Sequence, residues 1–70
     1  MHINRFLTNR EREVFRLLVR NFDTFEISEQ LQISEKTVRN HISNVIQKLG
    51  VRGRSQAIVE LVKVGELTID

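Results

Sequence analysis

Apolar residues recur at helical spacing along most of the chain. The clearest stripe lies in residues 35–49, where at about 100° per residue one narrow arc of a helix would hold Val38, Ile42, Val45 and Leu49. Ile46 stands at the margin of that arc. The chain has no proline, low-complexity tract or internal repeat that would mark a linker. The pattern therefore predicts one all-α domain of four helices over residues 3–68.

Capping residues predict where the first helix begins and ends. Thr8 is followed three residues later by Glu11, which is the spacing of a capping box, in which each side chain satisfies a free amide. The helix is expected to end near Asn21, because asparagine tolerates a left-handed backbone better than most residues. Its inward face would consist of Val14, Leu17 and Leu18.

A second, short helix is predicted to start at another capping box. Asp23 would be its N-cap and Glu26 its third residue, and its inward residues would be Ile27 and Leu31. A tight connection of Gln32 and Ile33 then leads into the next helix. Two helices joined this closely are typical of a helix-turn-helix motif, here at about residues 23–49.

The last two helices are bounded by serine and glycine. Ser34 is expected to cap the third helix, which would end at Gly50, a residue that adopts the left-handed conformation without a side-chain penalty. The fourth helix is expected to start after Arg54, with Ser55 as its N-cap, and to end at Gly65.

The side of the third helix opposite its apolar stripe carries an unusual set of polar residues. A solvated helix surface usually pairs glutamate with lysine four residues apart. Here Glu35 is the only acid, and the polar arc holds Lys36, Asn40, Ser43 and Gln47, with Arg39 on its flank. All of these side chains suit contacts to base edges or phosphates. The pattern indicates a face that lies in the major groove of DNA.

Positive charge gathers around the same segment. The formal net charge is only +2, but residues 34–54 hold five cations against Glu35, a local charge of +4. A basic patch of this kind is expected of a nucleic-acid binder, although a solvated helix can carry one as well.

Composition excludes several other classes of protein. There is no cysteine, so the chain has neither disulfides nor thiolate metal ligands, and His2 and His41 are too few for a metal cluster. Apolar runs reach only three residues, which excludes a signal peptide or membrane span and predicts a cytoplasmic protein. No nucleophile is paired with a base and no cofactor motif occurs, so no enzyme is expected. His41 is interpreted as a half-buried structural histidine, and a phosphate contact is the alternative.

Three longer motifs resemble one family. They are LTNREREVFRLL at 7–18, ISEKTVRNHISN at 33–44 and KLGVRGRSQA at 48–57. With this spacing the chain resembles the LuxR-type helix-turn-helix domain of bacterial transcription regulators from Leu7 to about Gly65. The resemblance is greatest to the stand-alone spore regulators of that family. It implies a homodimeric, nucleoid-associated regulator of late sporulation and spore-coat genes, with RNA polymerase as a possible partner.

The resemblance also implies roles for individual residues. The helix matching 35–49 would be the recognition helix, and the positions that face base edges would be Arg39, Asn40 and Ser43. Contacts to the DNA backbone would come from Thr24, Lys36, Thr37, Asn44 and Lys48. No metal or cofactor is implied.

The fourth helix carries more apolar surface than one core requires. Its apolar residues span roughly 220° at about 100° per residue, whereas a stripe of about 100° suffices to face one core. The family uses the matching helix, about 55–64, for dimerisation, which implies an interface of Val59, Val62 and Val64, with Ile58 and Leu61 in the core. The alternative is simple exposure of these valines. A two-fold dimer would read a pseudo-palindromic DNA site.

Three residues depart from the family pattern. Asn21 replaces a glycine, Ser28 replaces an alanine and needs a hydrogen-bond acceptor one turn back, and Phe25 replaces a polar residue. Phe25 is expected to fold with Phe22 over the end of the first helix; an exposed partner site is the alternative. Two further functional alternatives remain, namely the effector domain of a two-component response regulator and a protein-interaction module that does not bind DNA.

Overall fold

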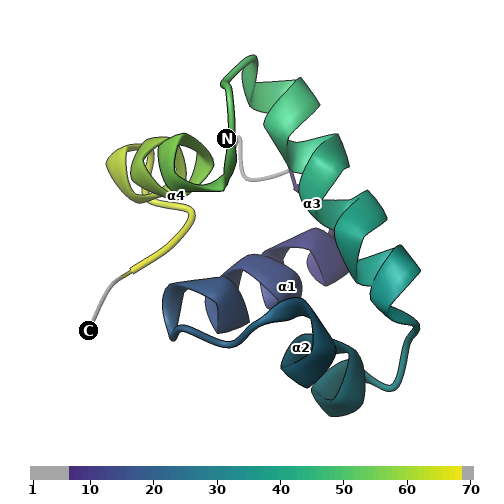
Figure 1. Ribbon diagram of the computed structural model, residues 1–70. Helices are drawn as coiled ribbons and strands as arrows, with labels where there is room; N and C mark the ends of the chain where they lie inside the picture. The colour runs from purple at the N-terminus through teal and green to yellow at the C-terminus, as the bar shows by residue number, and fades with distance from the viewer. Residues whose placement is uncertain (1–6, 69–70) are drawn as a thin grey trace.

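The computed structural model describes residues 7–68. These residues form four helices and no strand: α1 (Asn9–Val19), α2 (Thr24–Leu31), α3 (Glu35–Leu49) and α4 (Arg54–Lys63). The other three helices all pack against α3 and lie on one side of it, so its opposite side is left uncovered (Figure 1). The all-α fold is as predicted. Within the described residues, no helix is both long and apolar enough to cross a membrane.

The predicted caps of the first three helices are confirmed. In α1, Thr8 Oγ1 accepts from the Glu11 amide at 3.1 Å, and the Glu11 carboxylate accepts from the Thr8 amide at 2.9 Å. Asp23 and Glu26 make the same reciprocal pair at 2.8 and 2.9 Å. The Ser34 hydroxyl accepts from the third amide of α3 at 3.0 Å. Each helix therefore begins where local hydrogen bonding predicts.

Left-handed residues end the helices before each turn. Asn21 (φ 71°) follows α1 and Gly50 (φ 69°) ends α3, both as predicted. Gln32 (φ 57°) ends α2 and donates its amide to the Ser28 carbonyl. Since Cβ crowds the carbonyl in this conformation, Gln32 is strained there, whereas asparagine and glycine tolerate it.

Replacing Gln32 by glycine is expected to stabilise the domain by about 0.5–1 kcal/mol, because the strain at its positive φ exceeds the added entropy of the unfolded chain. Urea denaturation followed by circular dichroism measures the change. Asn21→Gly is the matched control and should gain less, since asparagine already tolerates this conformation. A lower urea midpoint for Gln32→Gly would show that the Gln32 side chain itself stabilises the turn.

The start of the fourth helix differs from the prediction. Its N-cap is Gly53, not Ser55, and the helix begins at Arg54. The Gly53 carbonyl already accepts from the Ala57 amide at 3.0 Å, so the first turn closes two residues earlier than expected. Ser55 is exposed within that turn. Glycine is an acceptable N-cap, and the sequence preference for serine did not decide the boundary.

The core lies between α3 and the other helices and contains Leu7, Val14, Phe15, Ile27, Val38, Ile42, Val45, Ala57, Leu61 and Leu67. The prediction for α1 was partly wrong, because Phe15 is fully buried while Leu17 and Leu18 are only partly buried. The inward arc of α1 is thus turned toward Glu11 and Phe15. In α4, Leu61 is buried and Ile58 is partly buried, as predicted.

The two aromatic residues near α2 behave differently. Phe22 packs partly buried against the core, as predicted. Phe25 is less covered than expected, because 57% of its surface is exposed. It lies two residues before the buried Ile27, so a helix of 3.6 residues per turn places it on the outer face. Ser28 donates to the Phe25 carbonyl at 2.7 Å, which is the acceptor one turn back that the sequence required.

Candidate nucleic-acid interface

The uncovered face of α3 is the candidate interface, and its exposed polar residues are Lys36, Arg39, Asn40, Ser43, Asn44 and Gln47. All the predicted base-reading residues are among them. The apolar stripe of the same helix is buried in the core. The face is held rigidly, because α3 contacts every other helix. It presents donors and acceptors for base edges, with cations for phosphates.

Glu35 joins this face to α2, a role that the sequence did not reveal. Its Oε2 accepts from the Thr24 hydroxyl at 3.0 Å and lies 4.0 Å from Arg39 Nη1. The carboxylate therefore tethers the start of α2 to α3 and places a negative charge near the exposed guanidinium of Arg39. Thr37 is partly buried, and its hydroxyl accepts from Ser34 at 2.9 Å. Glu35 thus supports the helix-turn-helix through its contact to α2, although its negative charge opposes the binding of an anionic ligand to this face.

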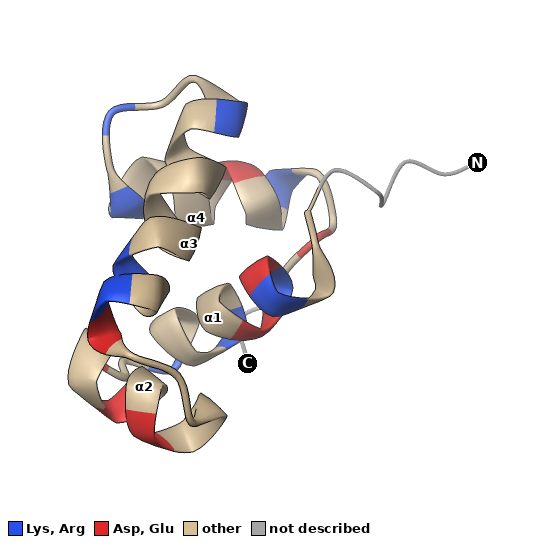
Figure 2. Ribbon diagram, turned by 90° about the vertical axis from the view of Figure 1, so that its right-hand side faces the viewer, with Lys and Arg blue, Asp and Glu red and all other residues tan. Residues whose placement is uncertain are grey.

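Charge is distributed as the sequence predicted. Blue segments follow α3 and the connection after it on one side of the molecule, whereas α2 carries red bands and no blue ones (Figure 2). An anionic ligand would therefore be attracted to the α3 side, and clusters of one sign raise its local concentration.

Lys48, predicted to contact the DNA backbone, has a partner inside the protein. Its Nζ donates to Glu11 Oε1 at 2.6 Å, and the Glu11 side chain is only 4% exposed. This ion pair joins the last turn of α3 to the first turn of α1. Burial by itself would raise the pKa of Glu11. The hydrogen bonds from Lys48 and Thr8, together with the charges of Lys48 and half-buried His41, outweigh this effect, so the pKa of Glu11 lies below its ordinary value.

The lowered pKa of Glu11 predicts acid sensitivity. Its ionised form is favoured in the folded state, so this stabilisation is complete above the ordinary glutamate pKa of about 4.3 and is lost as the pH falls through the folded value. Urea denaturation at a series of pH values should therefore show wild type more stable than Glu11→Gln at pH 7, with the difference closing below about pH 4.3. A difference that stays constant with pH would mean that the carboxylate charge is not stabilising.

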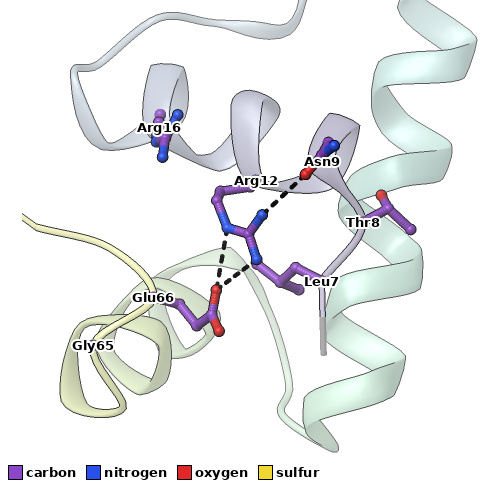
Figure 3. A pocket seen from close by; sticks show the side chains of 7 residues that line it. All are labelled: Leu7, Thr8, Asn9, Arg12, Arg16, Gly65 and Glu66. Carbon is purple, nitrogen blue, oxygen red and sulfur yellow. Dashed lines mark hydrogen bonds and ion pairs between the residues drawn. The ribbon is translucent and has the colours of Figure 1, made fainter. Parts of the chain in front are cut away.

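A hollow beside α1 is lined in part by a second ion pair. Arg12 Nε and Nη2 donate to Glu66 Oε1 at 3.2 and 3.0 Å, and its Nη1 donates to Asn9 at 3.3 Å (Figure 3). Leu67, the next residue, is buried in the core. The pair ties the segment after α4 back to α1. In the described part of the chain, no group of three or more potential metal ligands occurs.

The fourth helix leaves apolar surface uncovered. Val59 and Val64 are 54% and 65% exposed, while Val62 is partly buried against the core. The sequence had predicted this surplus from the width of the apolar arc. Val59 lies within α4 and Val64 is its C-cap, so the exposed valines stand in the middle of the helix and at its end.

Comparison with known proteins decides the family. A model of the luxR family of bacterial regulatory proteins matches residues 5–61. The chain belongs to this family. As a luxR-family protein it carries a helix-turn-helix DNA-binding domain, and regulation of transcription, rather than catalysis, is the activity of the family.

Other luxR-type proteins extend the likeness. The chain is 68% identical to the spore germination protein GerE of Bacillus subtilis (strain 168) over 63 residues, which cover 90% of this chain and 85% of GerE. It is 51% identical to the transcriptional regulatory protein DegU of Brevibacillus brevis over 59 residues, but covers only 25% of that protein. The solved structure of the transcription factor GerE superimposes with a TM-score of 0.91 and 71% identity, covering 93% of this chain and 97% of that one.

Proposed function

We propose that this protein is a homodimeric, sequence-specific regulator of late sporulation and spore-coat genes. The observation that carries the proposal is the uncovered face of α3, where exposed hydrogen-bonding and cationic side chains lie opposite the buried residues Val38, Ile42 and Val45. A helix of this kind fits the major groove of B-DNA, which admits one α-helix and displays a distinct pattern for each base pair. The identity to GerE supports the sporulation role.

Three residues of this face are proposed to read bases. Arg39 is suited to donate two hydrogen bonds to guanine, Asn40 to pair with adenine, and Ser43 to contact either base. All are exposed, and the Glu35 carboxylate lies 4.0 Å from the Arg39 guanidinium.

Contacts to the DNA backbone are proposed for Thr24, Lys36, Thr37, Asn44 and Lys48. The threonine and asparagine side chains lie along the edges of α3 or at the start of α2, and the lysines supply positive charge for phosphates. Such contacts orient the protein on the duplex without selecting a sequence. Lys48 stays in this set, although Glu11 already holds its ammonium.

We propose that α4 forms the dimer interface through Val59, Val62 and Val64. The exposure of Val59 and Val64 supports it, because burying them against a second copy removes apolar surface from water. A two-fold axis through α4 would present two recognition helices to a pseudo-palindromic site. Such a DNA-bound protein would lie in the cytoplasm, on the nucleoid.

Replacing Val59 by aspartate is expected to weaken the dimer at least about tenfold, since an unpaired carboxylate would be buried in the interface. Sedimentation equilibrium of the purified chain measures the dissociation constant. Asn9→Asp on α1 is the control, because it adds the same charge at an exposed position. A Val59→Asp protein that dimerises like wild type would contradict the proposed interface.

The gene, and not the chain, distinguishes a stand-alone regulator from the effector domain of a response regulator. The chain spans most of GerE but only a quarter of DegU. The DNA sequence upstream of the Met1 codon tests this, because an in-frame receiver domain there would establish the alternative. If the protein has no sensor domain, its activity would depend on how much of it is made.

Binding-site selection tests the proposed function directly. The purified chain is incubated with random duplexes near physiological salt, and bound DNA is recovered and sequenced over several rounds. We expect an enriched motif with two-fold symmetry and half-sites about 10 bp apart, or a multiple of this spacing. A pool that stays random would contradict sequence-specific binding and would favour a protein-interaction module of the same fold.

A further inference from the structure

We propose that the outer face of α2, centred on Phe25, docks a cationic and partly apolar segment of the transcription apparatus bound beside this protein on DNA. The inference rests on the proposed function, because it requires α3 to lie in the groove. It concerns a surface separate from the exposed face of α3 and from the valines of α4. We call it the α2 patch, and define it by the residues that line its shallow hollow: Phe22, Phe25, Glu26, Glu29 and Gln30.

The α2 patch combines an exposed aromatic residue with a hollow. Phe25 is 57% exposed, one of the exposed large apolar residues of the described chain together with Val59 and Val64. Phe22 forms the partly buried floor beside it. Aromatic residues set in a hollow and rimmed by polar groups are typical anchors of protein interfaces.

The charge of the α2 patch selects the kind of partner. Residues 20–33 contain three acids and one cation, a net charge of −2, and that cation, Arg20, lies with its guanidinium carbon 6.0 Å from the centre of the Phe22 ring. Asp23 and Glu26 share the capping box, but Glu29 is exposed and has no ion-pair or hydrogen-bond partner among residues 7–68. A surface of this sign repels phosphates, so it does not extend the DNA interface. It complements lysine or arginine side chains.

The position of α2 indicates where that partner lies. In the helix-turn-helix, α2 precedes α3 and packs against it, so a groove-bound α3 places α2 beside the duplex. Proteins on the neighbouring DNA carry cationic surfaces, because they too neutralise phosphates. An apolar side chain of such a protein would enter the hollow at Phe25, and its flanking cations would meet Glu26 and Glu29.

The test separates DNA occupancy from transcription. This chain, carrying Phe25→Ser, Glu29→Lys or both substitutions, replaces GerE in sporulating Bacillus subtilis. DNA occupancy and transcript level are then measured at promoters that the wild-type chain occupies and regulates. We expect occupancy within about twofold of wild type, while the double variant loses its effect on transcription by about 5- to 150-fold, the usual range for coupling between two sites. Glu13→Lys on α1 makes the same charge change at an exposed site and should leave both readouts unchanged.

Each other outcome overturns the proposal. A double variant that keeps both occupancy and regulation shows that the α2 patch docks nothing needed for transcription. Loss of occupancy, with an unchanged urea midpoint for the purified variant, shows that the α2 patch serves DNA binding instead. A changed oligomeric mass shows that it contacts a second copy of the chain. Failure of the wild-type chain to select any DNA sequence would be the separate failure of the proposed function.

Discussion

Arg39→Ala is expected to relax the preference for one base pair in each half-site while leaving binding to other positions unchanged. A bidentate contact from arginine to guanine contributes about 1–3 kcal/mol of discrimination, which corresponds to about 5- to 150-fold between the preferred base and the others. The exposed position of Arg39 on the uncovered face of α3 supports this role. Repeating binding-site selection with the variant, followed by titration of single-base variants of the site, measures the loss.

Lys36→Ala is the matched control for this experiment. It removes a charge from the same exposed face, so binding to every sequence should weaken uniformly, and the slope of log affinity against log salt should fall by about one per subunit. Lys36 is a better control than Lys48, because Glu11 holds the Lys48 ammonium and removing it would disturb the fold. If Arg39→Ala also weakens all sequences equally, Arg39 contacts phosphate and not a base.

Lys48→Met is expected to destabilise the domain by about 2–4 kcal/mol. Removing the Lys48 ammonium leaves the Glu11 carboxylate buried without its cation. Breaking a fully buried ion pair costs about 3–5 kcal/mol. The expected loss of stability is smaller here because the Lys48 side chain is 34% exposed. A domain of 70 residues has a total stability of roughly 4–10 kcal/mol, so the loss would be a large fraction. Urea denaturation at pH 7 measures it.

Two further variants separate the ion pair from a contact to DNA. Lys48→Arg should retain most of the stability, because a guanidinium can still donate to the carboxylate. Glu11→Gln combined with Lys48→Met should recover part of the loss, since no buried charge is then left unpaired. If Lys48→Met unfolds at the wild-type urea concentration and only lowers the salt slope of DNA binding, the lysine acts at phosphate alone.

Most of the local structure could be predicted because it depends on contacts within one helical turn. A capping box involves residues three apart, so Thr8 with Glu11 and Asp23 with Glu26 were visible as spacings. The same holds for the polar face of α3, because its period is that of the helix itself. The N-cap of α4 was missed, since glycine and serine both suit that position and packing decided between them.

Residues whose role depends on a distant segment were harder to assign. Phe15 was not placed in the core, because the apolar residues of α1 cover more than one possible inward arc and only the packing of α1 on α3 selects among them. Phe25 was expected to be covered, but it lies on the outer face of α2 and 57% of its surface is exposed. Glu35 was treated only as the one acid among cations, because its contact to Thr24 depends on the turn that packs α2 against α3.

The sequence by itself determined the four-helix order, the helix-turn-helix and the exposed face of α3, because periodicity and capping are local properties of the chain. The tertiary structure alone decided which charges pair with one another inside the protein. Lys48 and Glu11 are 37 residues apart, and no spacing rule pairs them. Their contact exists because α1 crosses the last turn of α3, where a buried carboxylate requires a cation. Arg39 and Lys48 are both cations on α3, and only the packing of the helices distinguishes Lys48, which pairs with buried Glu11, from Arg39 on the uncovered face.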